Sequence, residues 1–284
     1  MKLDKRRRYY MVLDCETATL PYAINYDGEE RKRIAIAKPL IYDLGWKIVD
    51  RIGRVYARRS FLISEIFSVP AVFNTAYYAD KRPIYLRKLE AGETELVTWA
   101  QASAVLVEDM ACVYAVGAYN AMFDFKKAIP FTELYISMLY SPKYYDWEKM
   151  QNHFCDILAT SPHSKKSDKS FDPEIFRFRG VDYPLFDLWG LSCEYLLNND
   201  DYKRMCYENG WFTASGKYFK TSAESAYRFV SGNYEFDEAH TAVEDADIET
   251  ELLVKIMKPK ASNLNIGISY FPFRKLGRVK IEIG

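Results

Sequence analysis

Short apolar runs alternate with amphipathic stretches along the first part of the chain, and several of the runs end in an acidic residue. Residues 9–13 predict a buried strand that carries Asp14 at its tip. Residues 41–49 and 55–63 predict two further strands, joined by a turn at 50–53. Together these segments predict an antiparallel meander.

Residues 93–110 have apolar positions at helical spacing, and residues 111–118 are again apolar and strand-like. Strand, hairpin, helix and strand in this order indicate an α/β fold, a mixed β-sheet flanked by helices. Between about residues 130 and 182 the pattern becomes aromatic-rich and irregular, which predicts an insertion. After it we expect helices at 186–197, 222–230 and 241–257, and a hairpin at 210–220.

Composition narrows the class of protein. With 284 residues, of which 49% are hydrophobic and 16% aromatic, the chain can fill a sizeable core. No apolar run is long enough for a membrane span and the N-terminus does not resemble a signal peptide, so we expect a cytoplasmic protein without membrane contact. Lys plus Arg and Asp plus Glu number 39 each, which argues against a protein that coats long nucleic acids.

The first candidate for chemistry is the pair Asp14 and Glu16 at the end of the first strand. Side chains two residues apart on a strand point to the same face, so the two carboxylates should converge. Carboxylates that close repel each other unless a cation lies between them, which predicts a site for a hard divalent metal. Two solvated acids at a strand end are the competing interpretation.

The second candidate is Asp124, which follows the apolar segment 111–118 and lies between Phe123 and Phe125. An acid between two buried rings is itself expected to be partly buried and to need a positive partner. The alternative is an aspartate at a helix start that faces the helix dipole.

The third candidate is the pair His240 and Asp245 at the start of the last helix. Thr241 and Glu244 have the spacing of a capping box, which predicts Thr241 as the N-cap. The residues that flank such a cap contact each other, so His240 and Asp245 should be neighbours. A histidine near a cap is otherwise more often structural than catalytic.

Taken together, the three segments resemble the motifs of the DEDDh branch of the DnaQ-like 3′→5′ exonucleases, in the ribonuclease H-like superfamily. The matching segments are Asp14 to Thr17, Asn120 to Asp124 and His240 to Asp245, in the order of the family. The resemblance covers about residues 8–257 as a single exonuclease domain and leaves 258–284 as a C-terminal extension.

The resemblance implies a ribonuclease H-like sheet and a two-metal mechanism with Mg²⁺ or Mn²⁺. In it Asp14, Glu16, Asp124 and Asp245 would hold the two cations and His240 would act as general base. The residues implied in substrate binding are Thr17, Leu20, Asn120 and Phe123.

The implied substrate is the 3′ end of a single-stranded or frayed DNA or RNA. A polymerase or a second copy of the chain is left open as a partner. Two other functions stay open: a catalytically silent module that binds nucleic acid or a polymerase, and a phosphodiesterase that acts on small nucleotides.

Overall fold

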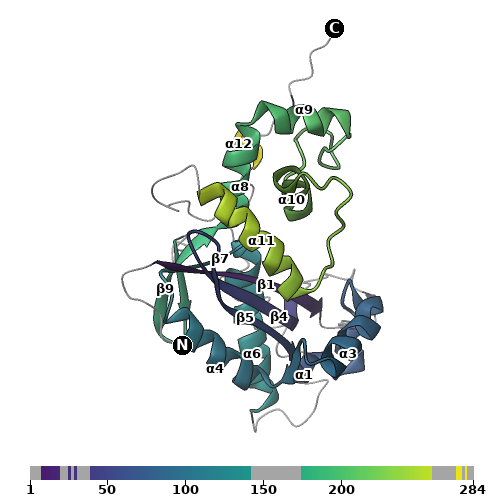
Figure 1. The fold of residues 1–284 in the computed structure, drawn as a ribbon. Coiled ribbons are helices and arrows are strands. Elements are labelled where there is room, and N and C mark those ends of the chain that lie inside the picture. Colours follow the sequence, from purple (N-terminus) through teal and green to yellow (C-terminus); the bar gives the residue numbers. More distant parts are fainter. Residues whose placement is uncertain are drawn as a thin grey trace.

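The computed structural model describes residues 8–19, 25–26, 29–30, 39–141, 174–257, 273–276 and 279. A seven-stranded mixed sheet forms its centre, in the order β6-β5-β4-β1-β7-β9-β8 (Figure 1). The strands of this sheet are β1 (Tyr9–Thr19), β4 (Pro39–Asp50), β5 (Val55–Ile63), β6 (Glu95–Val97), β7 (Ala115–Ala118), β8 (Ile175–Phe178) and β9 (Val181–Asp187). Two short strands, β2 (Asn25–Tyr26) and β3 (Glu29–Glu30), pair separately.

Helices lie on both faces of the sheet (Figure 1). The elements before β8 are α1 (Ser64–Phe67), α2 (Pro70–Phe73), the 3-10 turn η1 (Ala79–Lys81), α3 (Arg82–Glu90), α4 (Trp99–Met110), α5 (Ala121–Phe123), the π-helical turn η2 (Asp124–Ala128) and α6 (Ile129–Leu139). Those after β9 are α8 (Leu188–Leu197), α9 (Asp200–Glu208), α10 (Ala223–Ser231), α11 (Ala242–Met257) and α12 (Phe273–Leu276). In the described part of the chain, no helix combines the length and apolarity needed to cross a bilayer.

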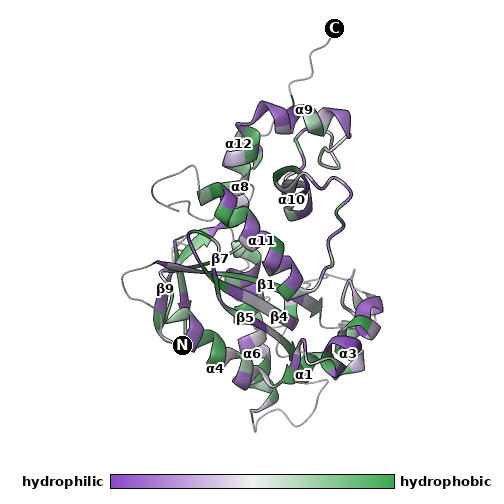
Figure 2. Ribbon diagram, in the orientation of Figure 1, coloured by the Kyte–Doolittle hydropathy of each residue, from purple (hydrophilic) through white to green (hydrophobic). Residues whose placement is uncertain are grey.

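The core has two parts, one on each face of the sheet, and β1 contributes to both. Met11 and Leu13 pack with α4 and α6, whereas Tyr10 and Val12 pack with α8 and α11. Apolar and polar residues alternate along the helices that pack on the sheet (Figure 2). A strand that is buried on both faces is central to the fold, so its acidic end is held rigidly.

The strand pairing confirms the predicted α/β class and the predicted meander. β4 pairs antiparallel with both β1 and β5. The chain reverses from β4 to β5 through a turn at Gly53, whose φ is 85°. β7 and β9 add to the other side of β1 as parallel strands. Their connections therefore pass through helices, as parallel pairing requires.

Two predicted boundaries in the middle of the chain are wrong. The segment 93–110 is not one helix, because β6 pairs in parallel with β5 before the helix begins. The Thr98 side chain accepts a hydrogen bond from the Gln101 N–H in a capping box, which starts α4 only at Trp99. The following strand is also shorter than 111–118, since α4 is capped at Ala111 and β7 begins at Ala115.

The later elements follow the prediction more closely. α10 and α11 begin within one residue of the expected positions, but strand β9 continues to Asp187 and delays the helix expected from residue 186. The hairpin expected at 210–220 is reduced to an isolated antiparallel bridge between Phe212 and Phe219.

The segment 130–182 is expected from the sequence to be an insertion. The parts of it that the structure describes, at its two ends, belong to the central sheet and its helices. Its first part is α6, whose Tyr135 lies in the core, and its last part is β8 with the beginning of β9. Residues 142–173 lie outside the described residues. In the expected extension 258–284, Phe273 of α12 packs against Trp189 at a ring centroid distance of 5.7 Å.

Candidate active site

Asp14 and Glu16 lie on the face of β1 that carries Tyr10 and Val12, the face covered by α11. Both side chains are half-buried. The predicted convergence of the two carboxylates agrees with their electrostatics, since the charge of Glu16 contributes to raising the pKa of Asp14. The pair therefore points into the space between β1 and the start of α11.

The start of α11 is docked unusually close to the sheet. A Cβ atom at Gly45, the β4 residue paired with Asp14, would lie only 2.3 Å from the Val243 backbone nitrogen. The carboxylate of Asp43 accepts a hydrogen bond of 2.9 Å from the Ala242 N–H, and so caps the helix from another strand. Because of these two contacts, the first turn of α11 lies directly above the acidic end of β1.

Thr241 stands at the helix start, as predicted, and its carbonyl accepts the Glu244 and Asp245 N–H groups. Its hydroxyl donates to the Glu244 side chain, and Lys88 of α3 forms an ion pair of 2.8 Å with the same carboxylate. The helix start is thus tied to β4 by Asp43 and to α3 by Lys88.

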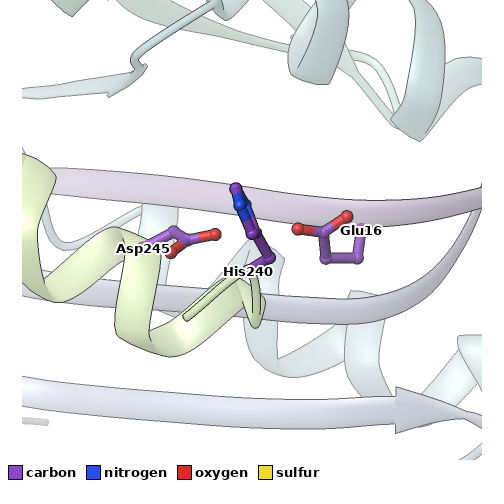
Figure 3. Close-up of side chains that lie close together, drawn as sticks. All are labelled: Glu16, His240 and Asp245. Atoms are coloured by element: carbon purple, nitrogen blue, oxygen red, sulfur yellow. The ribbon is translucent and has the colours of Figure 1, made fainter. Parts of the chain in front are cut away.

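This docking brings Glu16, His240 and Asp245 together, although they come from opposite ends of the sequence (Figure 3). One potential ligand atom of each side chain lies within 4.8 Å of those of the other two, so the three could hold a metal ion. In Figure 3 the imidazole stands between the two carboxylates. The predicted contact between His240 and Asp245 is also present, because the Asp245 carboxylate accepts a hydrogen bond from the His240 backbone N–H.

His240 has the left-handed backbone conformation, with φ of 53°. Its ring stacks on Tyr78 at a centroid distance of 4.4 Å and an angle of 15°. Lys81 lies over the same Tyr78 ring and donates to the Ala239 carbonyl at 2.6 Å. These contacts hold an unfavourable backbone conformation, a form of strain that often accompanies function.

The surroundings of His240 favour its neutral form. Burial lowers the pKa of the imidazole, and the nearby Lys81 ammonium lowers it further. About 32% of the side chain is still exposed, so a water or substrate atom can reach it. A neutral, accessible imidazole is the state that a general base requires.

The carboxylates of the site lack enough positive charge to balance them. Burial, followed by the charge of Asp245, raises the pKa of Glu16 to about 9. Burial, followed by the charge of Glu238, raises the pKa of Asp245 to about 8. The pKa of Asp14 is also raised, by burial and then by Glu249. An acidic set of this kind fits divalent cations, which would supply the missing charge.

Asp124 is buried at the first position of the π-helical turn η2. Its carboxylate accepts a hydrogen bond of 3.0 Å from the Cys15 thiol, and burial raises its pKa to about 7. Its charge acts on Asp14, yet among the described residues it does not join the compact group of Glu16, His240 and Asp245. Asp14 and Asp124 therefore form a second part of the site beside that group.

The residues expected to bind substrate are less closely gathered. Thr17 is half-buried one residue beyond Glu16, and Asn120 is exposed just before α5. Phe123 is half-buried and packs against the core. Leu20 lies outside the described residues.

Several residues of the site were not predicted, although some carried a signal. Asp43 and Gly45 act through the docking of α11, and Tyr78 and Lys81 contact His240 from a segment with no recognisable pattern. Glu249 is a buried acid on the sheet-facing side of α11. An acidic residue on an otherwise apolar helix stripe was the signal that could have revealed it.

The chain was compared with protein-family models, with curated proteins and with solved structures, and none of them matches it.

Proposed function

We propose that this protein is a metal-dependent 3′→5′ exonuclease of the DEDDh type, with a ribonuclease H-like fold. The observation that carries the proposal is the meeting of Glu16, His240 and Asp245 within 4.8 Å. Glu16 of the first predicted motif and His240 and Asp245 of the third thus lie together in one group, and Asp14 and Asp124 lie beside that group. A structural histidine at a helix cap would not require the half-buried Glu16 and the buried Asp245 on either side.

The sheet supports the same proposal in coarser terms. An antiparallel meander of β1, β4 and β5 is extended by the parallel strands β7 and β9, with helices on both faces. Asp14 and Glu16 lie on the central strand β1, Asp124 lies in the turn η2 that follows β7 and α5, and Asp245 lies in the first turn of α11. This is compatible with the mixed sheet that the resemblance implies.

Asp14, Glu16, Asp124 and Asp245 are the residues that would hold two divalent cations, Mg²⁺ or Mn²⁺. When bound, such cations neutralise phosphate charge and make water more acidic. His240 accepts the proton of the attacking water at its exposed ring edge, since the lowered pKa keeps the imidazole neutral near pH 7. Tyr78 holds the ring in place by stacking.

The proposed substrate is the 3′ end of a short single-stranded segment of DNA or RNA. The chain has no net charge at pH 7, and Arg58 and Arg59 are paired with Asp247 and Asp109. Because the net charge is zero and these two guanidinium groups are already paired, we expect binding to involve only a few nucleotides. We expect slow or distributive digestion.

The test uses single-stranded DNA and RNA of one sequence, labelled at the 5′ end, with Mn²⁺, with Mg²⁺ and with a chelator. We expect metal-dependent ladders that shorten from the 3′ end, slower digestion of a 3′-phosphorylated strand, and intact circular strands. Asp245→Asn should abolish the ladder. Asp247→Asn, two residues further along the same helix, is the matched control and should keep it.

Other outcomes would select another function. Cleavage of circular strands would identify an endonuclease. Binding of labelled strands without cleavage under any metal condition would favour a silent binding module. Hydrolysis restricted to small nucleotide phosphodiesters would favour a phosphodiesterase.

A further inference from the structure

Glu249 is a deeply buried carboxylate on the site-facing side of α11, with only 2% of the residue exposed. It follows Asp245 by four residues, so the two side chains lie on one face of the helix, about 6 Å apart along its axis. The helix packs across β1 and β4. Glu249 therefore lies one turn deeper than Asp245, above the same strands.

The carboxylate of Glu249 is only partly satisfied by the described residues. The Tyr119 backbone N–H, at the end of β7, donates a hydrogen bond to it. Its Oε2 atom has no hydrogen-bond partner among the described residues. A buried carboxylate oxygen without a partner costs free energy that a purely structural residue would avoid.

The charged groups that act most strongly on Glu249 are acidic. Asp124, Asp245 and Glu238 are its charged neighbours, in that order of strength. Among the charged groups that raise the pKa of Asp14, Glu249 has the largest effect. Asp14, Asp124 and Glu249 thus act on one another electrostatically beside the group of Glu16, His240 and Asp245, and of the described residues no basic one is among the strongest charges that act on them.

We propose that Glu249 is a fifth carboxylate of the metal centre and, together with Asp14 and Asp124, holds the second divalent cation. This inference rests on the proposed function and extends it, because the motifs account for only four acids. The unpartnered Oε2 atom provides the free oxygen ligand, and Mg²⁺ and Mn²⁺ both prefer such oxygens. Glu16, His240 and Asp245 would surround the first cation position.

The experiment measures Mn²⁺ binding to the full chain by calorimetry and by electron paramagnetic resonance, without substrate. The wild-type protein should bind two Mn²⁺ ions. Glu249→Gln keeps the size of the side chain and its ability to accept from the Tyr119 N–H, but removes the charge. We expect this variant to bind one ion as before and the second at least about tenfold more weakly.

Glu251→Gln is the matched control, because Glu251 lies on the same helix but is exposed and contacts the Tyr227 hydroxyl. It should still bind two ions. If Glu249→Gln does not fold, Glu249→Asp provides the same test, since it keeps the charge and withdraws the oxygens by one methylene group.

The two proposals fail in different ways. Two Mn²⁺ ions bound with unchanged affinities in the Glu249 variant would overturn the role of Glu249 and leave the exonuclease proposal standing. A wild-type chain that binds no divalent cation would overturn the proposed function itself.

Discussion

The Cys15 thiol donates a hydrogen bond of 3.0 Å to the carboxylate of Asp124, and both side chains are buried. Cys15 lies between Asp14 and Glu16 in β1, so its side chain points to the opposite face of the strand. Asp14 and Glu16 therefore lie on one face of β1. Cys15, on the other face, orients the carboxylate of a third acid, Asp124. This contact links the first and second motifs directly.

Removing the thiol should disturb Asp124. Cys15→Ala leaves the buried carboxylate without this donor, which should lower the free energy of unfolding by about 1–3 kcal/mol and weaken Mn²⁺ binding about tenfold. Cys15→Ser keeps a donor and should stay close to wild type. Denaturant unfolding and Mn²⁺ titration measure the two effects. Equal behaviour of the Ala and Ser variants would show that the hydrogen bond does not matter.

The metal-free protein should lose stability as the pH rises. The pKa values of Asp124, Asp245 and Glu16 are raised to about 7, 8 and 9, above the usual value of about 4 in the unfolded chain. Protons are therefore held more tightly in the folded state, and the stability that they confer declines between about pH 4 and pH 9. We expect the melting temperature in chelator to fall across this range, and added Mn²⁺ to reverse the fall.

Neutralising one acid should reduce this pH dependence. Asp245→Asn removes a repelling charge, so its melting temperature in chelator at pH 8 should equal or exceed that of the wild type, although activity is lost. Asp247→Asn, which removes an acid already paired with Lys47 and Arg58, should keep the wild-type slope with pH. A wild-type slope in the Asp245 variant would contradict the electrostatic account of the site.

His240→Ala tests the proposed role of His240 as general base. Its rate should fall by about two to four orders of magnitude, while Mn²⁺ affinity and substrate binding stay nearly unchanged. In the wild type, activity should rise with pH through a limb below about 6.5, because burial and Lys81 lower the pKa of the imidazole. This limb should be absent from the variant. A large loss of Mn²⁺ affinity would instead identify His240 as a metal ligand, which its distance to Glu16 and Asp245 also permits.

Gly45→Ala tests the docking of α11. The new methyl group would lie 2.3 Å from the Val243 backbone nitrogen, so the helix start must move away from β4. We expect unfolding free energy to fall by about 1–3 kcal/mol and activity to fall with it, because Asp245 and His240 move with the helix. Ser60→Ala, at the residue of β5 paired with Gly45, is the control and should leave both unchanged.

Local patterns in the sequence determined the elements and the pairs of residues that are close along the chain. Apolar runs predicted β1, β4 and β5, and helical spacing with a cap signal predicted α11 to within one residue. Strand alternation placed Asp14 and Glu16 on one face, and the helix start placed His240 beside Asp245. These predictions succeeded because the geometry of strands and helices repeats every few residues, so the order of apolar and polar residues along the chain reveals it.

Only the tertiary structure decided how those pairs meet. The distance from Glu16 to His240 and Asp245 depends on two residues of β4. Gly45 has no side chain and lets α11 approach the strand, and the Asp43 carboxylate caps the helix. The stacking of Tyr78 on His240 likewise joins segments that no spacing connects. Contacts between distant segments arise from the packing of whole elements, where a single missing Cβ can set the distance, and no local period in the sequence records them.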